Sequence, residues 1–192
     1  MSKIKRSYIL ITLLLLVGFA VLLPVFIVTG SPLAQTALIT VGVTLYHFAM
    51  RLFVGTVLDA LMKNKADHSH PWFREKAFEK KLYKLLRVRA WSGSLPTYSP
   101  EDFDTEKRTV MELIGATCQA ELVHEVIMVL SLLPMVLIPF LGGATALILT
   151  SIFSMLYDSL FVILQRYNRP RLVRVMRRFG KIPAKGKSFV TY

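Results

Sequence analysis

The sequence contains little of what small secreted or metal-binding domains depend on. It has one cysteine, Cys118, so an intramolecular disulfide framework is excluded. We find no Cys/His spacing typical of zinc, no glycine-rich loop for phosphate and no internal repeat. What remains is a chain of 192 residues that is 54% hydrophobic and carries a formal net charge of +12. High hydrophobicity together with a basic excess indicates an integral membrane protein.

Four apolar segments are long enough to cross a bilayer. The first follows basic residues, as in a signal peptide, but its apolar core of about 21 residues is long enough to span. Because more apolar segments follow, we interpret it as a retained helix. Short uncharged turns, TGSP and LGG, join the members of each pair. The sequence predicts an all-α, integral membrane four-helix bundle in a single domain (1–192), with spans at about 8–28, 33–61, 112–141 and 144–166.

The distribution of lysine and arginine predicts the orientation. Of 24 such residues, 23 lie on one side of a four-span topology, and Arg51 is the exception. The positive-inside rule places that side in the cytoplasm. We therefore expect a multi-pass protein of the cell membrane, whose two termini, central loop (63–110) and basic C-terminal tail (167–192) are cytoplasmic.

The central loop carries an amphipathic pattern. Over residues 71–90 apolar side chains recur at helical spacing with lysine and arginine between them, and Pro71 suits a first turn. Such a helix lies at the membrane interface, where its cations contact anionic headgroups, so we expect lipid rather than nucleic acid as the partner. The Ser-Pro-Glu-Asp signal at 99–102 leads towards the third span. The apolar residues of the pattern are Phe78, Leu82, Leu85 and Leu86.

Three ionisable residues stand at the start of the third apolar run. Glu121, His124 and Glu125 share one face of a helix. The apolar run after them (126–141) gives only about 24 Å of helix, and the hydrocarbon core needs about 30 Å. We therefore expect the three residues to lie within the membrane, close to its surface. There His124 is suited to act as a general base, with Glu121 or Glu125 orienting it.

Polar residues of two other spans fall near the same depth. These are His47 and Arg51 in the second span and Asp158 in the fourth. Ionisable groups in a membrane normally face the bundle interior and pair there, so we expect them to bind substrate, and Asp158 is a further candidate to orient the base. The alternative is a purely structural clamp that joins the third span to Arg51 or His47.

Two other histidine patterns have weaker functional interpretations. Glu-x-x-His is half of a di-metal motif, but only His47, Asp59 and Asp158 are available to complete it, so we expect no metal site. His70 and Glu75 mimic the His-x4-acid pattern of acyltransferases whose site lies on a soluble face. Because a proline follows His70, we predict a helix cap there.

The segment QRYNRPRLVRVMRR (165–178) follows the fourth apolar run. Its planar donors suit phosphate or carboxylate, and Pro170 is expected to break the helix. The alternative is a basic anchor for lipid headgroups, which accounts fully for Arg174, Arg177 and Arg178. The candidate ligand-binding residues are Gln165, Arg166, Tyr167, Asn168, Arg169 and Arg171.

Three stretches together resemble one known family. AELVH (120–124), QRYNRPRL (165–172) and LYKLLRVRAWSGSLP (82–96) are similar to the signatures of glycosyl-4,4′-diaponeurosporenoate acyltransferases. Those are small bacterial membrane enzymes that esterify the sugar of a glycosylated C30 carotenoid acid. The resemblance covers roughly residues 72–175. It implies functional positions at Glu121, His124, Gln165, Arg166, Tyr167, Asn168, Arg169 and Arg171, with Arg89 and Trp91 in the loop.

From these patterns we expect a membrane acyltransferase with no bound cofactor. Acyl-CoA or another acyl donor is the expected co-substrate, and a glycolipid or similar amphipathic lipid, such as a carotenoid glycoside, the acceptor. Asn168, Arg169 and Arg171 would bind donor phosphates or the oxyanion, and Arg89 and Trp91 would guide substrate at the interface. The alternatives are a methyltransferase or reductase with a nucleotide cofactor, and a non-enzymatic lipid-binding scaffold. The oligomeric state stays open.

Overall fold

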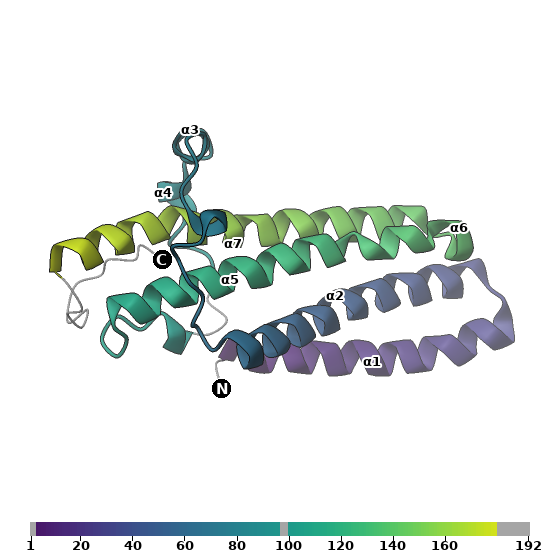
Figure 1. The fold of residues 1–192 in the computed structure, drawn as a ribbon. Helices are drawn as coiled ribbons and strands as arrows, with labels where there is room; N and C mark the ends of the chain where they lie inside the picture. Colours follow the sequence, from purple (N-terminus) through teal and green to yellow (C-terminus); the bar gives the residue numbers. More distant parts are fainter. Residues whose placement is uncertain (1–2, 97–99, 180–192) are drawn as a thin grey trace. The chain divides into compact units, whose positions relative to one another are not determined.

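The computed structural model describes residues 3–96 and 100–179, and every regular element in these ranges is a helix (Figure 1). The prediction of an all-α chain is confirmed for this part. In chain order the elements are α1 (Lys3–Thr29), α2 (Pro32–Met62), η1 (Pro71–Phe73), α3 (Glu79–Leu85), α4 (Val88–Trp91), η2 (Pro100–Asp102), α5 (Val110–Ser131), η3 (Leu133–Leu137), α6 (Ile138–Leu141) and α7 (Ala144–Phe179).

The expected spans are present as four helical stretches that are long and apolar enough to cross a membrane. Helix α1 buries no side chain and exposes many leucines and valines, as a helix in contact with lipid does. The protein is therefore a membrane protein. The stretches are Lys3–Thr29, Pro32–Met62, Val110–Leu141 and Ala144–Arg178.

The third stretch is not one regular helix. It consists of α5, the 3-10 helix η3 and the short helix α6. Pro134 and Pro139 each stand in the first turn of one of the short helices, where the missing N–H costs least. The prolines thus explain why the regular hydrogen-bond pattern of α5 ends at Ser131.

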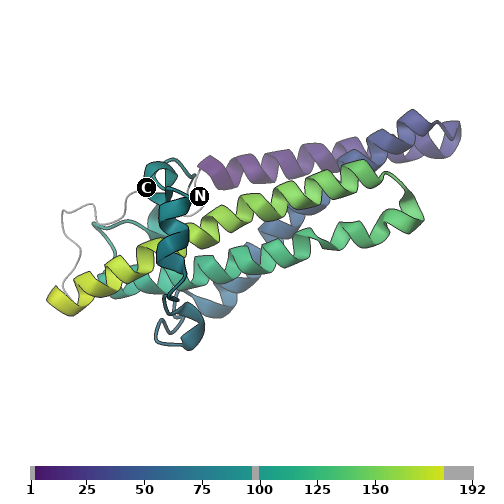
Figure 2. The same cartoon turned by 90° about the horizontal axis from the view of Figure 1, so that it is seen from above.

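The chain falls into two compact units. Among the described residues the first consists of 3–56 and 126–158, and the second of 57–125 and 159–179. In the first unit, α1 packs on α2, where the rings of Tyr8 and Phe48 lie 5.2 Å apart between centroids. The turn at Gly142 and Gly143, both with positive φ, connects α6 to α7 (Figure 2).

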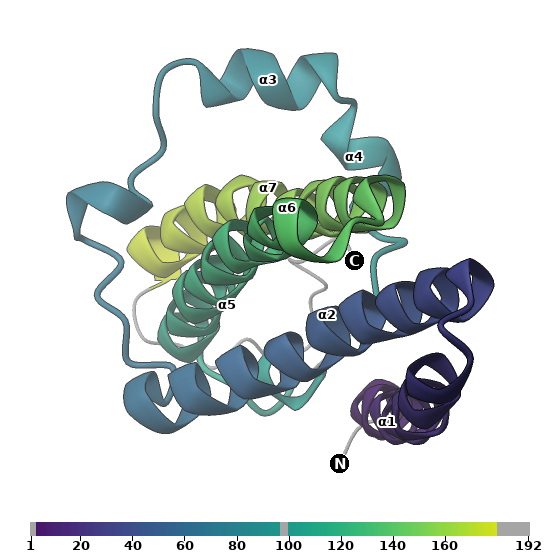
Figure 3. The same ribbon diagram turned by 90° about the vertical axis from the view of Figure 1, so that its right-hand side faces the viewer.

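In the second unit, the segment 71–90 forms three short helices, η1, α3 and α4. The prediction of one continuous helix over this segment is therefore wrong. Arg87 has a left-handed conformation, with φ of 49°, and separates α3 from α4 (Figure 3). The cap at His70 is confirmed, because its Nδ1 accepts a hydrogen bond from the Trp72 backbone N–H at 3.3 Å. Pro71 occupies the first turn of η1, as predicted.

Two helix boundaries also differ from the sequence expectation. Helix α7 runs through Pro170 to Phe179, so the predicted break is wrong and the first part of the expected tail is helical. Proline is tolerated in membrane helices when neighbouring groups satisfy the freed carbonyl. The start signal at 99–102 contains η2, although Ser99 lies outside the described residues. Helix α5 begins only after Thr109, whose backbone and hydroxyl exchange hydrogen bonds with Glu112 in a capping box.

The turn that follows α2 packs closely on α5 at Gly115. A Cβ atom on Gly115 would lie 2.1 Å from the carbonyl oxygen of Asn64. The Asn64 backbone N–H donates to the Gln119 side chain at 2.7 Å, and its side-chain amide donates to Asp102 at 3.0 Å. The contact therefore has little freedom to open.

We expect Gly115→Ala to lower the free energy of unfolding by about 2 kcal/mol, because backbone atoms have to move apart. Thermal unfolding of the purified protein in detergent measures this. The matched control is Gly55→Ala on α2, where no heavy atom among the described residues lies within 4 Å of the new Cβ. An equal loss in both variants would contradict the close contact.

Candidate active site

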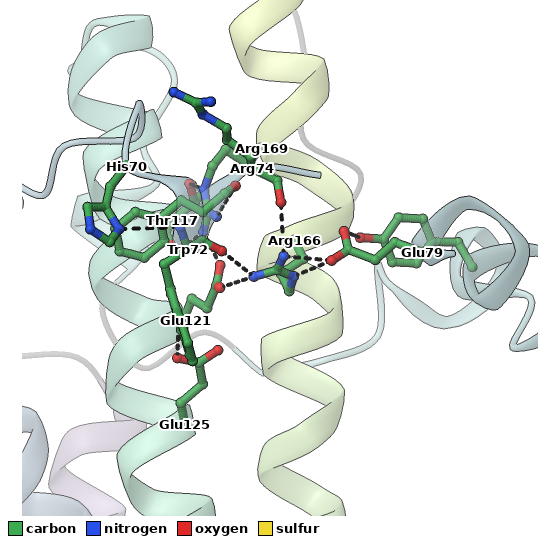
Figure 4. A network of polar contacts seen from close by, with 11 residues as sticks. His70, Trp72, Arg74, Glu79, Thr117, Glu121, Glu125, Arg166 and Arg169 are labelled. Carbon is green, nitrogen blue, oxygen red and sulfur yellow. Dashed lines mark hydrogen bonds and ion pairs between the residues drawn. The ribbon is translucent and has the colours of Figure 1, made fainter. Parts of the chain in front are cut away.

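Glu121 is the fully buried centre of the candidate site. It lies on α5 and its carboxylate accepts hydrogen bonds from two arginines of α7 (Figure 4). Arg166 Nη1 is 2.5 Å from Oε1, and Arg169 Nη2 bonds Oε2. Two motifs that the sequence presents separately, around 121 and around 166–169, are thus joined.

Arg169 is almost completely buried and bonds several groups of the same unit. Its Nε donates to the Thr117 hydroxyl at 3.1 Å, and Nη2 donates to the Thr117 carbonyl at 2.9 Å. Nη1 donates to the Phe73 carbonyl at 3.1 Å, and the guanidinium lies 5.0 Å from the centroid of the Phe73 ring. Arg169 therefore ties α7 to α5 and to the loop.

Arg166 uses all five of its N–H groups on protein acceptors. Besides the bond to Glu121, Nε and Nη2 donate to Glu79 Oε1 at 2.9 and 2.6 Å. Nη1 also donates to the Trp72 carbonyl and Nη2 to the Arg74 carbonyl, each at 3.1 Å. Together with Arg169, it therefore holds three successive loop carbonyls, those of residues 72–74.

Glu79 completes a buried ionic cluster, which we define as Glu79, Glu121, Arg166 and Arg169. Only 3% of Glu79 is exposed, and its Oε2 accepts a hydrogen bond from the Tyr83 hydroxyl at 2.8 Å. Burial, together with the neighbouring carboxylate, raises the pKa of Tyr83 above its ordinary value, so the hydroxyl remains a donor. Two acids and two bases cancel in formal charge, which is the condition for burying them.

His124 and Glu125 lie on α5 just beyond the cluster. The half-buried imidazole of His124 stacks on the Phe161 ring, with centroids 4.5 Å apart and planes 12° apart. The half-buried carboxylate of Glu125 accepts a hydrogen bond from the Trp72 indole at 2.8 Å. Among the described residues, the hydrogen bond on the Glu125 carboxylate therefore comes from a neutral donor, whereas those on Glu121 come from arginines.

The other candidates of the α7 segment divide by burial. Gln165 and Asn168 are buried, and among the described residues Asn168 Oδ1 has no hydrogen-bond partner. Arg171 is half-buried, lies 3.8 Å from the centroid of the Tyr167 ring and donates to its hydroxyl.

In the loop, Arg89 is exposed, whereas the Trp91 indole donates to the Leu86 carbonyl at 2.9 Å and closes the α3–α4 turn.

The two polar candidates of the second span, Arg51 and His47, differ in their contacts within the first unit. Arg51 forms an ion pair with the buried Asp158 and donates to the Ser154 hydroxyl at 2.7 Å. His47 is 5% exposed, and in the described part of the chain neither ring nitrogen has a hydrogen-bond partner. The structure thus brings Arg51 together with Asp158, and Glu121 together with Arg166 and Arg169, each set within its own unit.

Sequence reasoning missed three residues of the site: Trp72, Glu79 and Thr117. The available signal for Glu79 is its charge, since it is one of two acids, with Glu75, in a strongly basic stretch. The signal for Trp72 is its place directly after the capped proline turn. Thr117 gives no signal of its own. Within residues 3–96 and 100–179, no group of three or more His, Cys, Asp or Glu is arranged to hold a metal ion.

The fold and the site define an all-helical membrane protein in which a buried ionic cluster fastens a loop to two helices. A family model described as glycosyl-4,4′-diaponeurosporenoate acyltransferase matches residues 69–178, more than half of the chain. The chain belongs to this family, as its motifs predicted, and membership supports a general acyltransferase role. The matched segment contains the whole ionic cluster as well as His124 and Glu125. No curated protein and no solved structure matches the chain.

Proposed function

We propose that this protein transfers a fatty acyl group to a hydroxyl of a glycolipid or similar amphipathic acceptor, with His124 as the general base. The observation that carries the proposal is the position of His124. It is half-buried, stacked on Phe161 and one helical turn from a carboxylate that two arginines hold in place. A histidine supported in this way is suited to accept a proton from an attacking hydroxyl.

In the proposed reaction the acceptor oxygen attacks the acyl carbonyl while His124 takes the hydroxyl proton. An ester C–O bond forms, the bond from the acyl carbon to the donor breaks, and His124 returns the proton to the leaving group. With acyl-CoA as donor, the broken bond is a thioester and the leaving group a thiolate. Glu121 is not the base in this scheme, because both of its oxygens already accept from arginines.

Arg171 is the arginine of the α7 motif best placed to meet the donor. Arg166 has no N–H left, and four hydrogen bonds engage Arg169. Arg171 bonds only the Tyr167 hydroxyl among the described residues. We therefore assign donor phosphate binding to Arg171, and to Arg166 and Arg169 the task of organising the site.

The proposal places the site at the cytoplasmic leaflet of the cell membrane. Its support is the distribution of lysine and arginine, 23 of 24 on the side that holds both termini. At that leaflet the basic loop would contact anionic headgroups.

The test is complementation of a deletion strain, with lipids extracted and compared by mass spectrometry. We expect the deletion to remove one acylated lipid and His124→Ala to form it about 10²- to 10⁴-fold more slowly than the wild type. His68→Ala, in the loop, is the matched control and should restore the lipid fully. A folded, normally expressed His124→Ala protein that forms the lipid at the wild-type rate would contradict the assignment.

A cofactor-dependent methyltransferase or reductase makes a different prediction. It requires stabilisation of the purified protein by S-adenosylmethionine or NADPH and not by acyl-CoA, which a thermal-shift comparison measures. A phosphate-bearing cofactor would also compete with protein acceptors for Arg166. A non-enzymatic scaffold predicts instead that changes at Glu121 and His124 reduce stability and leave the lipid profile of the cell unchanged.

A further inference from the structure

The side chain of Trp72 contacts the candidate site and has no role in the reaction proposed above. Its indole Nε1–H donates to Glu125 Oε2 at 2.8 Å (Figure 4). Trp72 remains 51% exposed, and Glu125 is half-buried. Among the described residues, the second oxygen of Glu125, Oε1, has no hydrogen-bond donor.

The backbone of Trp72 is held on both sides. Its N–H donates to the His70 ring at 3.3 Å, and its carbonyl accepts from Arg166 at 3.1 Å. The next two carbonyls are fixed by Arg169 and Arg166. Since the buried ionic cluster determines the path of this segment, the indole is presented to α5 without a large loss of conformational freedom.

The two glutamates of the motif therefore differ in what they can bind. Glu121 is fully buried and both of its oxygens are occupied by guanidinium groups. Among the residues that the structure describes, one oxygen of Glu125 accepts from a neutral donor and the other has no donor. A carboxylate is an acceptor only, so the group that complements Oε1 is a donor such as a hydroxyl.

We propose that Glu125 binds the hydroxyl-bearing part of the acceptor through Oε1, and that Trp72 is the positioning residue that holds this carboxylate beside His124. The inference rests on the proposed function, because it assumes that the hydroxyl is delivered to His124 as the base. It adds an acceptor-binding residue and the loop residue that orients it.

The experiment is a double-mutant cycle in membranes of the complemented deletion strain. The variants are Trp72→Phe, which keeps an aromatic ring and removes the N–H, Glu125→Ala, and their combination. The initial rate of formation of the acylated lipid is measured against added lipid extract from the deletion strain, which contains the unacylated acceptor. Lys76→Met is the control, because Lys76 lies over the Trp72 ring, 5.7 Å from its centroid, and makes no hydrogen bond to Glu125 among the described residues.

We expect Trp72→Phe to raise the apparent KM for the acceptor roughly tenfold, the usual effect of losing a hydrogen bond to a charged group, with kcat little changed. In the Glu125→Ala background the same change should have no further effect, because Trp72 acts through Glu125. The proposal would be overturned if the effects of the two substitutions on KM simply multiplied in the double variant. It would also be overturned if Trp72→Phe had the same KM as the wild type.

A spectroscopic measurement separates this proposal from the proposed function. The indole N–H resonance of Trp72, assigned by its absence in Trp72→Phe, should shift in Glu125→Ala and stay in place in Lys76→Met. If it does not shift in Glu125→Ala, the positioning role is wrong. If it shifts and the cycle is non-additive while His124→Ala keeps its activity, the role of His124 fails and the Trp72–Glu125 pair stands.

Discussion

Glu121→Ala is expected to lower the free energy of unfolding by about 3–5 kcal/mol and to abolish formation of the acylated lipid. The substitution leaves Arg166 and Arg169 in a buried site without one of the two carboxylates that balance them. The loop carbonyls held by these arginines would lose their fixed positions as well. Chemical unfolding of the purified protein in mild detergent measures the loss.

The control for this prediction is Glu106→Ala, an exposed acid of the same unit, which should change stability by less than about 0.5 kcal/mol. A double variant, Glu121→Met with Arg169→Met, tests the cause. Because it removes a charge of each sign, it should cost less than the sum of the two single changes. Additive losses would show that the residues act independently and would contradict the coupling.

Arg51→Met is expected to lower the free energy of unfolding by about 3–5 kcal/mol through a different pair. The change removes the ion pair that Arg51 forms with Asp158, a carboxylate that is 1% exposed within a membrane-spanning unit. It also removes a hydrogen bond to the Ser154 hydroxyl. The same unfolding experiment detects the effect.

Adding Asp158→Asn to Arg51→Met should recover part of the lost stability, since a neutral amide is easier to bury than a carboxylate that has lost this ion pair. Arg6→Met, on the exposed surface of α1, is the matched control and should have little effect. If Arg51→Met and Arg6→Met were equally stable, Arg51 and Asp158 would contribute nothing as a pair.

The membrane spans could be predicted from the sequence because length and apolarity are local properties. All four appear in the structure, together with the turns at Gly30 and at Gly142. The errors lie where a local rule is overruled by its surroundings. Pro170 stays within α7, and the left-handed Arg87 divides a segment whose periodicity looked continuous.

The candidate site was predictable only in part, for a related reason. Glu121, Arg166 and Arg169 were each recognised from motifs, but their pairing joins residues 45 or more positions apart. No spacing rule connects such positions. Glu79 was hidden for the same reason, since its basic neighbours explain the amphipathic pattern, whereas the ion pair that buries this acid is with Arg166, 87 positions away.

The attachment of residues 72–74 through main-chain oxygens has a consequence for how this protein can diverge. Arg166 and Arg169 bind carbonyl groups, which every amino acid supplies, so these three hydrogen bonds do not depend on the side chains at residues 72–74. Relatives or designed variants can therefore exchange the side chains of this segment and change the surface it shows to a lipid, while the two arginines conserve its course.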